Sequence, residues 1–235
     1  MGIATRLVDL AGDALLTASE VTRVERIAPD LVRVGLRAEA FRGVRWTPGA
    51  KIQMRPRRGA LQLRTYTPIR WDTDDGDTEL VAFTHGDGPA STWFDRVRPG
   101  DSCELIGPRR SIDLPSLTGP VVAVGDESSV ALACALRTVH QDATTVFEAG
   151  HPEQLSVALS GLGLGDAVVV PRAADRTELV ERTRAAVAAT PGGDLLVTGD
   201  AATLHHLRRT ARRWEVPPRR ITGRAYWAAG RTGLD

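Results

Sequence analysis

Residues 64–68, with the sequence Arg-Thr-Tyr-Thr-Pro, combine side chains that can bind a phosphate and a flat ring. Alternate side chains of a strand face the same way, so Arg64 and Tyr66 share one face and Thr65 and Thr67 the other. Arginine clamps phosphates, tyrosine stacks on heterocycles, and Thr67 adds a hydroxyl. Taken alone, the segment also suits an exposed strand with a cross-strand aromatic pair.

A second segment, residues 85–91, ends a predicted strand, turns at two glycines and opens a helix. The first turn of a helix presents unpaired backbone N–H groups and the positive end of the dipole, which together bind anions. A pyrophosphate would fit at Gly88 and Ala90, with a hydroxyl from Ser91. An ordinary glycine turn is the alternative, and His85 either contacts a cofactor or simply ends its strand.

A third segment is an acidic turn after a predicted strand, where a dinucleotide fold carries its glycine-rich turn. It consists of Gly125, Asp126, Glu127 and Ser128. The glycine fingerprint is absent, and two carboxylates would repel a pyrophosphate, so the residues alone oppose nicotinamide binding. Glu148 ends the next predicted strand, where a carboxylate would accept a ribose hydroxyl and favour NADH over NADPH.

Two kinds of sequence meet near residue 118 and predict two domains, residues 1–115 and 116–235. The first half alternates apolar and polar residues in short runs, which indicates an antiparallel β-barrel with one short helix. Its strands are predicted at 21–27, 31–36, 51–55, 62–68, 79–85 and 102–106, and its helix at 89–97. The second half alternates buried strands with helices, which indicates a parallel α/β sheet. Its strands are predicted at 120–124, 144–148, 166–170 and 194–198, and its helices at 129–139, 176–189 and 201–214.

Composition excludes several classes of protein. The net charge of +1 argues against a nucleic-acid partner. Two cysteines are too few for a disulfide framework or an iron–sulfur cluster. Charges interrupt residues 1–16, and no run approaches the roughly 20 apolar residues of a membrane span, so we expect no signal peptide, no membrane insertion and a cytoplasmic location. We also expect a monomer.

Six blocks in a fixed order together resemble the siderophore-interacting proteins, a family of FAD-dependent ferric-siderophore reductases in the ferredoxin–NADP reductase superfamily. The blocks are residues 64–68, 85–91 with Trp93, 99–101, 107–109, 125–128 and 225–227. The resemblance implies a Greek-key FAD-binding β-barrel followed by a nucleotide-binding α/β domain. It also implies that the flavin carries out the chemistry, without a catalytic side chain or a bound metal.

The resemblance also implies roles for individual residues. The expected FAD-binding residues are Arg64, Thr65, Tyr66, Thr67, His85, Gly88, Ala90 and Ser91. The family uses the same acidic turn, so a nicotinamide from NADH or NADPH would approach the flavin beside Gly125, Asp126, Glu127 and Ser128. Asp200 stands where relatives carry a Gly-Glu pair, and it is expected on the same side.

The expected partner is an anionic ferric siderophore. Binding such an anion requires cations beside the flavin. One subgroup of the family uses three basic residues, of which two match Lys51 and Arg109. Lys51 is the only lysine among 30 lysines and arginines. The third position is Thr222, and Arg224, two residues on, lies on the same strand face and would substitute for it.

Three functions remain open at the level of sequence. The first is reduction of Fe(III)-siderophores by NAD(P)H through FAD, which releases Fe(II) for iron assimilation. The second is a general NAD(P)H diaphorase or flavin reductase, which the missing third basic residue favours. The third is a flavin- or siderophore-binding module without turnover.

Overall fold

The computed structural model describes residues 16–56, 63–86 and 88–230. The predictions for residues 1–15, for the start of the strand at 62 and for Asp87 lie outside the described residues. No helix in the described part of the chain is long and apolar enough to cross a membrane. The same residues contain no group of three or more His, Cys, Asp or Glu side chains that could hold a metal ion.

Seven strands form the first sheet, in the order β4-β3-β7-β1-β2-β6-β5, with antiparallel pairing throughout. They are β1 (Thr17–Ala28), β2 (Leu31–Arg37), β3 (Lys51–Arg55), β4 (Arg64–Tyr66), β5 (Pro68–Asp72), β6 (Asp77–Phe83) and β7 (Ser102–Arg109). A short 3-10 helix, η1 (Glu39–Phe41), follows β2, and α2 (Pro89–Arg96) lies between β6 and β7. The predicted strands and helix of this half are therefore present, with one exception.

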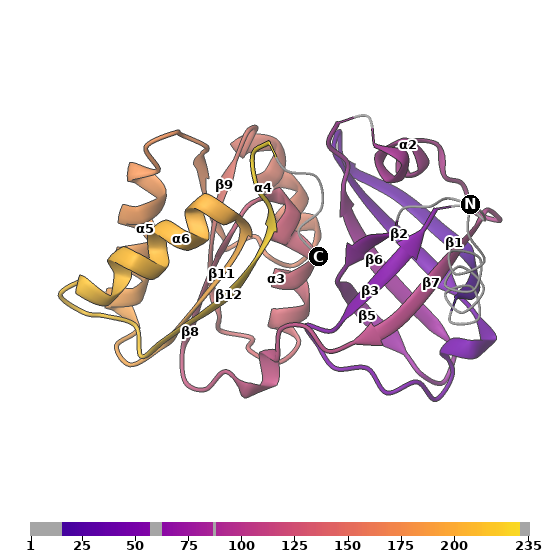
Figure 1. Ribbon diagram of the computed structural model, residues 1–235, viewed down its shortest axis with the longest axis horizontal. Coiled ribbons are helices and arrows are strands. Elements are labelled where there is room, and N and C mark those ends of the chain that lie inside the picture. Colours follow the sequence, from indigo (N-terminus) through magenta and orange to yellow (C-terminus); the bar gives the residue numbers. More distant parts are fainter. Residues whose placement is uncertain (1–15, 57–62, 87, 231–235) are drawn as a thin grey trace, which may run out of the picture.

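The exception is the predicted single strand 62–68, which is wrong because the chain changes partners at Thr67. β4 pairs with β3, whereas β5 begins at Pro68 and pairs with β6. β4 and β5 are the two ends of the sheet, yet only Thr67 separates them along the chain. The sheet must therefore curl until its two edges meet at Thr67, as the barrel in Figure 1 shows.

Five parallel strands form the second sheet, in the order β10-β9-β8-β11-β12. They are β8 (Val121–Gly125), β9 (Thr144–Ala149), β10 (Val168–Pro171), β11 (Asp194–Asp200) and β12 (Arg220–Trp227). The helices are α3 (Val130–Arg137), α4 (Pro152–Gly161), α5 (Thr177–Ala189) and α6 (Ala201–Thr210), with 3-10 turns η2 (Leu114–Ser116), η3 (Glu127–Ser129) and η4 (Ala211–Arg213). Helix α4 is not among the elements predicted above, and β12 is expected there only as the strand that carries residues 222 and 224, but the fold class is confirmed.

The strand order of the second sheet reverses between β8 and β11. The chain builds β8, β9 and β10 outward in one direction and then places β11 and β12 on the other side of β8. In open parallel sheets, the crevice outside the carboxyl ends of the strands at such a reversal is the usual ligand site. The acidic turn after β8 and Asp200 at the end of β11 both lie at this point.

The two sheets share a hydrophobic core. Leu31, Ile69 and Val81 of the first sheet belong to the same buried cluster as Val130 of α3 and Phe147 of β9. Helix α3 packs against β5 and β6, and α4 packs against β1. Figure 1 shows α3 between the barrel and the parallel sheet. The two halves are therefore held against each other by apolar burial, which keeps the carboxyl edge of the parallel sheet in a defined position beside the barrel.

Candidate functional site

The strand β4 presents its side chains as the sequence predicts. Tyr66 pairs with Ile52 and Arg64 with Met54, both of which point into the barrel core, whereas Thr65 pairs with the half-exposed Gln53. Directly paired antiparallel residues share a face, so Arg64 and Tyr66 lie on one side and Thr65 on the other.

Helix α2 lies beside this strand because two aromatic rings join them. The rings of Tyr66 and Phe94 are 5.3 Å apart in an edge-to-face arrangement, and Trp93 packs edge-on against Phe94 at 4.9 Å. Burial raises the pKa of the Tyr66 phenol above its ordinary value, so the ring stays neutral. A neutral tyrosine ring next to an arginine suits a ligand with both a flat ring and a phosphate.

The start of α2 is open toward solvent. Gly88 is the N-cap, without a side-chain cap, and the backbone N–H of Thr92 donates to its carbonyl at 2.9 Å. A Cβ built on Gly88 would meet no described atom within 4 Å, so no described side chain fills the space beside this residue. The backbone N–H groups of Ala90 and Ser91 belong to the unpaired first turn. This end of α2 therefore fits an anion such as a pyrophosphate.

His85 and Ser91 shape the loop that enters α2. The Ser91 hydroxyl donates to the His85 carbonyl at 3.0 Å, and the His85 ring lies 5.0 Å from that of Phe83. The hydroxyl expected on a phosphate is thus engaged with the loop itself. Since a hydroxyl oxygen also accepts a second hydrogen bond, this contact leaves Ser91 able to interact with a ligand.

Lys51 and Arg109 lie side by side, because they are direct partners in the β3–β7 pairing. Tyr66 is the partner of Ile52, so Thr67 reaches the level of Lys51 on the next strand across. Lys51 and Arg109 are therefore in a row with Thr67. This row lies at the seam of the barrel, where the edge strands β4 and β5 meet. Arg109 is exposed and Lys51 is half-buried.

Arg224 reaches the same region from the second sheet. Its Nη1 donates to the Ser111 hydroxyl at 3.2 Å, and Ser111 is two residues beyond Arg109. A groove of about 300 Å³ adjoins this segment. Its walls include Arg45, Arg109 and Arg110 together with Pro48, Ala50 and Pro108. Cations above an apolar surface suit an anionic ligand that carries aromatic rings.

Tyr226, next to the end of β12, connects the second sheet to the barrel seam. Burial raises the pKa of its phenol, and a hydrogen bond with Thr67 opposes that increase. The adjacent Trp227 turns the other way, and its Nε1 donates to Asp126 Oδ2 at 2.7 Å. Tyr226 thus contacts the seam of the barrel, and its neighbour Trp227 contacts the acidic turn.

Asp126 braces the crevice of the parallel sheet. Besides Trp227, it accepts the backbone N–H of Ser128 at 2.9 Å and that of Asp200 at 3.0 Å. Its carboxyl is buried, and this burial raises its pKa. The expected nicotinamide-side residue Asp126 therefore bonds to protein donors, and its charge is directed into the protein.

Glu127 is also engaged. Its Oε1 accepts the backbone N–H of Gly150 at 2.8 Å, and its Oε2 forms an ion pair with Arg172 Nη2. The guanidinium of Arg172 lies over the ring of Trp227, with 5.8 Å from its carbon to the ring centroid. Arg172 is not among the residues predicted from the sequence, although an arginine just after the predicted strand 166–170 was a usable signal.

Asp200 caps helix α6 and holds a second arginine. It accepts the backbone N–H groups of Ala202 at 3.2 Å and Thr203 at 3.1 Å, and Arg176 Nη2 at 2.9 Å. Burial acts to raise the pKa of Asp200, but these hydrogen bonds outweigh it and hold that pKa below its ordinary value. Asp200 is therefore an ionised cap at the carboxyl edge.

Glu148 is 3 % exposed, and its Oε1 accepts the Thr203 hydroxyl at 3.0 Å. This geometry does not support the predicted contact between Glu148 and a ribose. Burial raises its pKa, against the hydrogen bond from Thr203.

Replacing Glu148 by glutamine should make the protein more stable above about pH 5 and have little effect near pH 4. An acid whose pKa is raised by folding favours the folded state while protonated, and that contribution is lost as the pH rises from its ordinary value of about 4.3. Glutamine stays neutral and keeps an acceptor for Thr203. Thermal unfolding of both proteins between pH 4 and 8 measures the difference. Parallel curves across this range would contradict the prediction.

Comparisons with known proteins agree with this geometry. Residues 47–112 match the family model of the siderophore-interacting FAD-binding domain. No curated protein matches the chain. Among solved structures, a siderophore utilization protein from T. fusca is 24 % identical, with a TM-score of 0.71 over 94 % of this chain and 95 % of that one. The siderophore-interacting protein SipS from Aeromonas hydrophila is 22 % identical, with a TM-score of 0.70 over 92 % and 93 %.

A ferredoxin NADP+ reductase from Neisseria gonorrhoeae, solved with FAD and NADP, also shares the fold. It is 17 % identical, with a TM-score of 0.68 over 91 % of this chain and 99 % of that one. The resemblance found in the sequence is confirmed by the family match and by these neighbours. The family match supports an FAD-binding domain in the first half of the chain, and the solved structures show the fold of both halves.

Proposed function

We propose that this protein reduces the iron of anionic ferric siderophores, with FAD bound along β4 and α2 and a nicotinamide nucleotide as electron donor. When bound, FAD would accept a hydride from the nicotinamide and pass on single electrons. The observation that carries the proposal is the row of Thr67, Lys51 and Arg109, which places two cations at the barrel seam. The chain's own residues would bind the cofactor and the substrates and supply the charges around them.

Strand β4 and helix α2 offer contacts for two parts of FAD, the diphosphate and the flat ring system. The phosphates would lie at Gly88, Ala90 and Ser91, where the start of α2 is open. Arg64 supplies a guanidinium for them, since arginine binds phosphate through two parallel hydrogen bonds. The flat ring system would lie along Tyr66 toward Thr67 and Thr65, with its edge at the seam.

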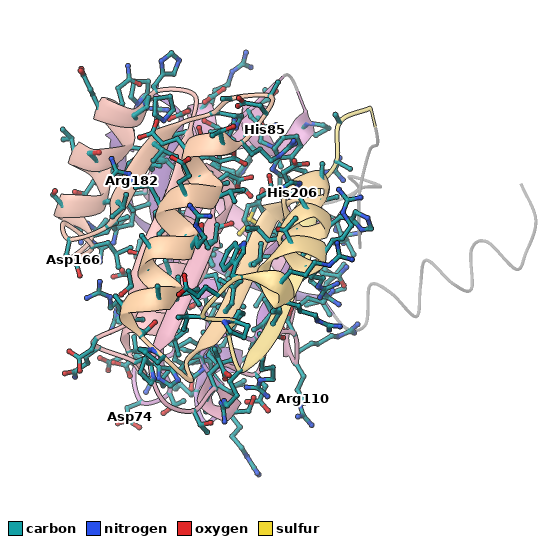
Figure 2. The ribbon with its side chains drawn as sticks, turned by 90° about the vertical axis from the view of Figure 1, so that its left-hand side faces the viewer. Asp74, His85, Arg110, Asp166, Arg182 and His206 are labelled. Carbon is teal, nitrogen blue, oxygen red and sulfur yellow. The ribbon has the colours of Figure 1, made fainter. Side chains whose placement is uncertain are left out.

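The ferric siderophore, which accepts the electrons, would bind at the end of the site opposite to the FAD phosphates. Figure 2 shows His85, which precedes α2, and Arg110, which follows Arg109, at opposite ends of the molecule. Arg45 and Arg109 supply cations to the groove near Ser111, to which Arg224 also bonds, and Arg110 lines the same groove paired with Asp113. Attraction of an anionic chelate to these cations raises its concentration beside the seam.

The protein does not need to bind the iron directly. Hard oxygen donors hold Fe(III) much more tightly than Fe(II), so reduction inside the siderophore releases the metal. The chain's residues orient the chelate and supply positive charge, and the cofactor supplies the redox chemistry.

The test is an anaerobic absorbance assay on the FAD-loaded protein. NADH or NADPH first bleaches the flavin band, and ferric chelates of different charge are then added with a ferrous trap. Replacing Lys51 or Arg109 by alanine should raise the KM for anionic chelates about 5- to 10-fold each, since each loses about 1 kcal/mol of charge attraction. Reduction of a neutral chelate should be unchanged.

Arg98→Ala is the matched control, because Arg98 is an exposed arginine in the same half of the chain. It should leave the KM of every chelate unchanged. If the reduced flavin passes electrons to no ferric chelate, the siderophore assignment fails. Equal rates with quinone, dye and iron acceptors, unaffected by Lys51→Ala, would favour a general diaphorase, which the threonine at position 222 also permits.

A further inference from the structure

At the carboxyl edge of the parallel sheet, backbone N–H groups of the kind that hold a dinucleotide are already paired within the protein. In such folds, backbone N–H groups of the first turn bind the diphosphate. Here the N–H groups of Ser128 and Asp200 donate to Asp126, and that of Gly150 donates to Glu127. Three backbone donors at the strand ends are thus already accepted by the protein's own carboxylates.

One cation at this turn remains close to solvent. Arg172 follows β10, and its side chain is 35 % exposed, whereas the side chain of its partner Glu127 is 6 % exposed. The arginine is therefore the solvent-exposed member of this ion pair, and the carboxylate is the buried one. Its guanidinium also covers Trp227, which in turn bonds to Asp126. The Arg172 side chain thus lies between solvent and the reversal point of the sheet.

We propose that Arg172 binds the diphosphate of the dinucleotide electron donor by exchanging Glu127 for it. The inference rests on the proposed function, because that function requires such a donor. Arg172 contacts Glu127 through Nη2 alone, and the planar guanidinium can present two parallel N–H groups to a phosphate. Glu127 then acts as a stand-in anion that keeps Arg172 in position while the crevice is empty of nucleotide.

The exchange leaves Glu127 with one remaining partner. Its Oε1 keeps the hydrogen bond from the Gly150 N–H, so the turn after β8 stays braced when Arg172 moves. Trp227 is held separately by Asp126. Because Arg172 lies over the Trp227 ring, its departure uncovers a flat aromatic surface beside the diphosphate. Tyr226, the neighbour of Trp227, bonds to Thr67 at the barrel seam, so this surface is one residue along β12 from a residue that contacts the seam.

The exchange predicts effects of opposite sign for the two partners. ADP-ribose carries the diphosphate but no nicotinamide, and adenosine carries neither. Arg172→Gln should weaken ADP-ribose binding about 10- to 100-fold, as expected when a charged hydrogen-bond partner is lost. Glu127→Gln should strengthen it about 3- to 10-fold, because Arg172 no longer has to leave a carboxylate. Adenosine binding should change in neither variant.

Isothermal titration of the FAD-loaded protein with ADP-ribose and with adenosine measures these affinities directly. Arg182→Gln is the matched control, since Arg182, labelled in Figure 2, lies on α5. Its side chain is 60 % exposed and pairs with Glu178. It should leave both affinities unchanged. Glutamine at 127 keeps an oxygen for the Gly150 N–H, so this variant should fold normally.

Two results would overturn the proposal. If Arg172→Gln and Glu127→Gln weaken ADP-ribose binding equally, the ion pair is only a structural brace. If ADP-ribose binds no more tightly than adenosine to the unmodified protein, Arg172 takes no diphosphate. Neither result depends on electron transfer, so the reduction of ferric chelates by chemically reduced flavin can succeed or fail independently.

Discussion

Replacing Arg64 by alanine should lower the affinity for FAD about 10- to 100-fold. Arg64 shares the face of Tyr66 on β4, next to the helix that offers the N–H groups of Ala90 and Ser91. A charge-assisted pair of hydrogen bonds to phosphate contributes about 1.5–3 kcal/mol. Titration of flavin-free protein with FAD, followed by quenching of flavin fluorescence, measures the change.

Arg64→Lys should give an intermediate affinity, because lysine keeps the charge but loses the planar fork. Arg70→Ala is the matched control: Arg70 belongs to β5, on the far side of Thr67, and its side chain is 51 % exposed. It should bind FAD as the unmodified protein does. An unchanged affinity in Arg64→Ala would remove Arg64 from the site and place the phosphates elsewhere.

Replacing Gly199 by alanine should destabilise the protein by about 2–6 kcal/mol. Gly199 has a φ of +98°, where a side chain costs about 1–3 kcal/mol. A Cβ there would lie 2.4 Å from Asp126 Oδ2, and that carboxylate cannot move without losing the donors Trp227 and Asp200. Such overpacking costs about another 1–3 kcal/mol. Chemical denaturation measures the loss.

Gly192→Ala separates the two contributions to that loss. Gly192 has a φ of +76°, but a Cβ on it would meet no atom within 4 Å. This variant should therefore lose only the conformational part, about 1–3 kcal/mol. If Gly199→Ala loses no more stability than Gly192→Ala, the Asp126 carboxylate can move away from the added methyl group at little cost. The hydrogen bonds that hold it at the carboxyl edge are then weaker than their geometry indicates.

Most of the fold was predictable because it depends on local patterns. The alternation of residues in β3 and the apolar run of β8 predict strands irrespective of their partners. The glycine turn and proline before α2 likewise predict a helix start. The face shared by Arg64 and Tyr66 follows from the two-residue period of a strand, and the structure agrees with it.

Strand pairing was not predictable from these patterns. Residues 62–68 have the continuous character of one strand, but the chain changes neighbours at Thr67, and that change depends on where β3 and β6 lie. The same holds for Lys51 and Arg109. They are 58 positions apart along the chain, and only the β3–β7 register makes them direct partners.

The acidic turn shows most clearly the difference between what the sequence predicts and what the tertiary structure decides. Counting charges in residues 125–128 predicts repulsion of a diphosphate, because a sequence shows which groups are present and not which groups pair. The folded chain directs Asp126 to Trp227 and Glu127 to Arg172, residues that lie 101 and 45 positions away.

The sequence by itself thus determined the fold class, and it named the segments that are proposed to bind FAD. The tertiary structure alone decided which charges are compensated and which cation faces solvent. Secondary structure and motif spacing arise from interactions between residues near each other in the chain. The partners of a buried charge depend instead on strand order and register, which bring distant residues within hydrogen-bond distance.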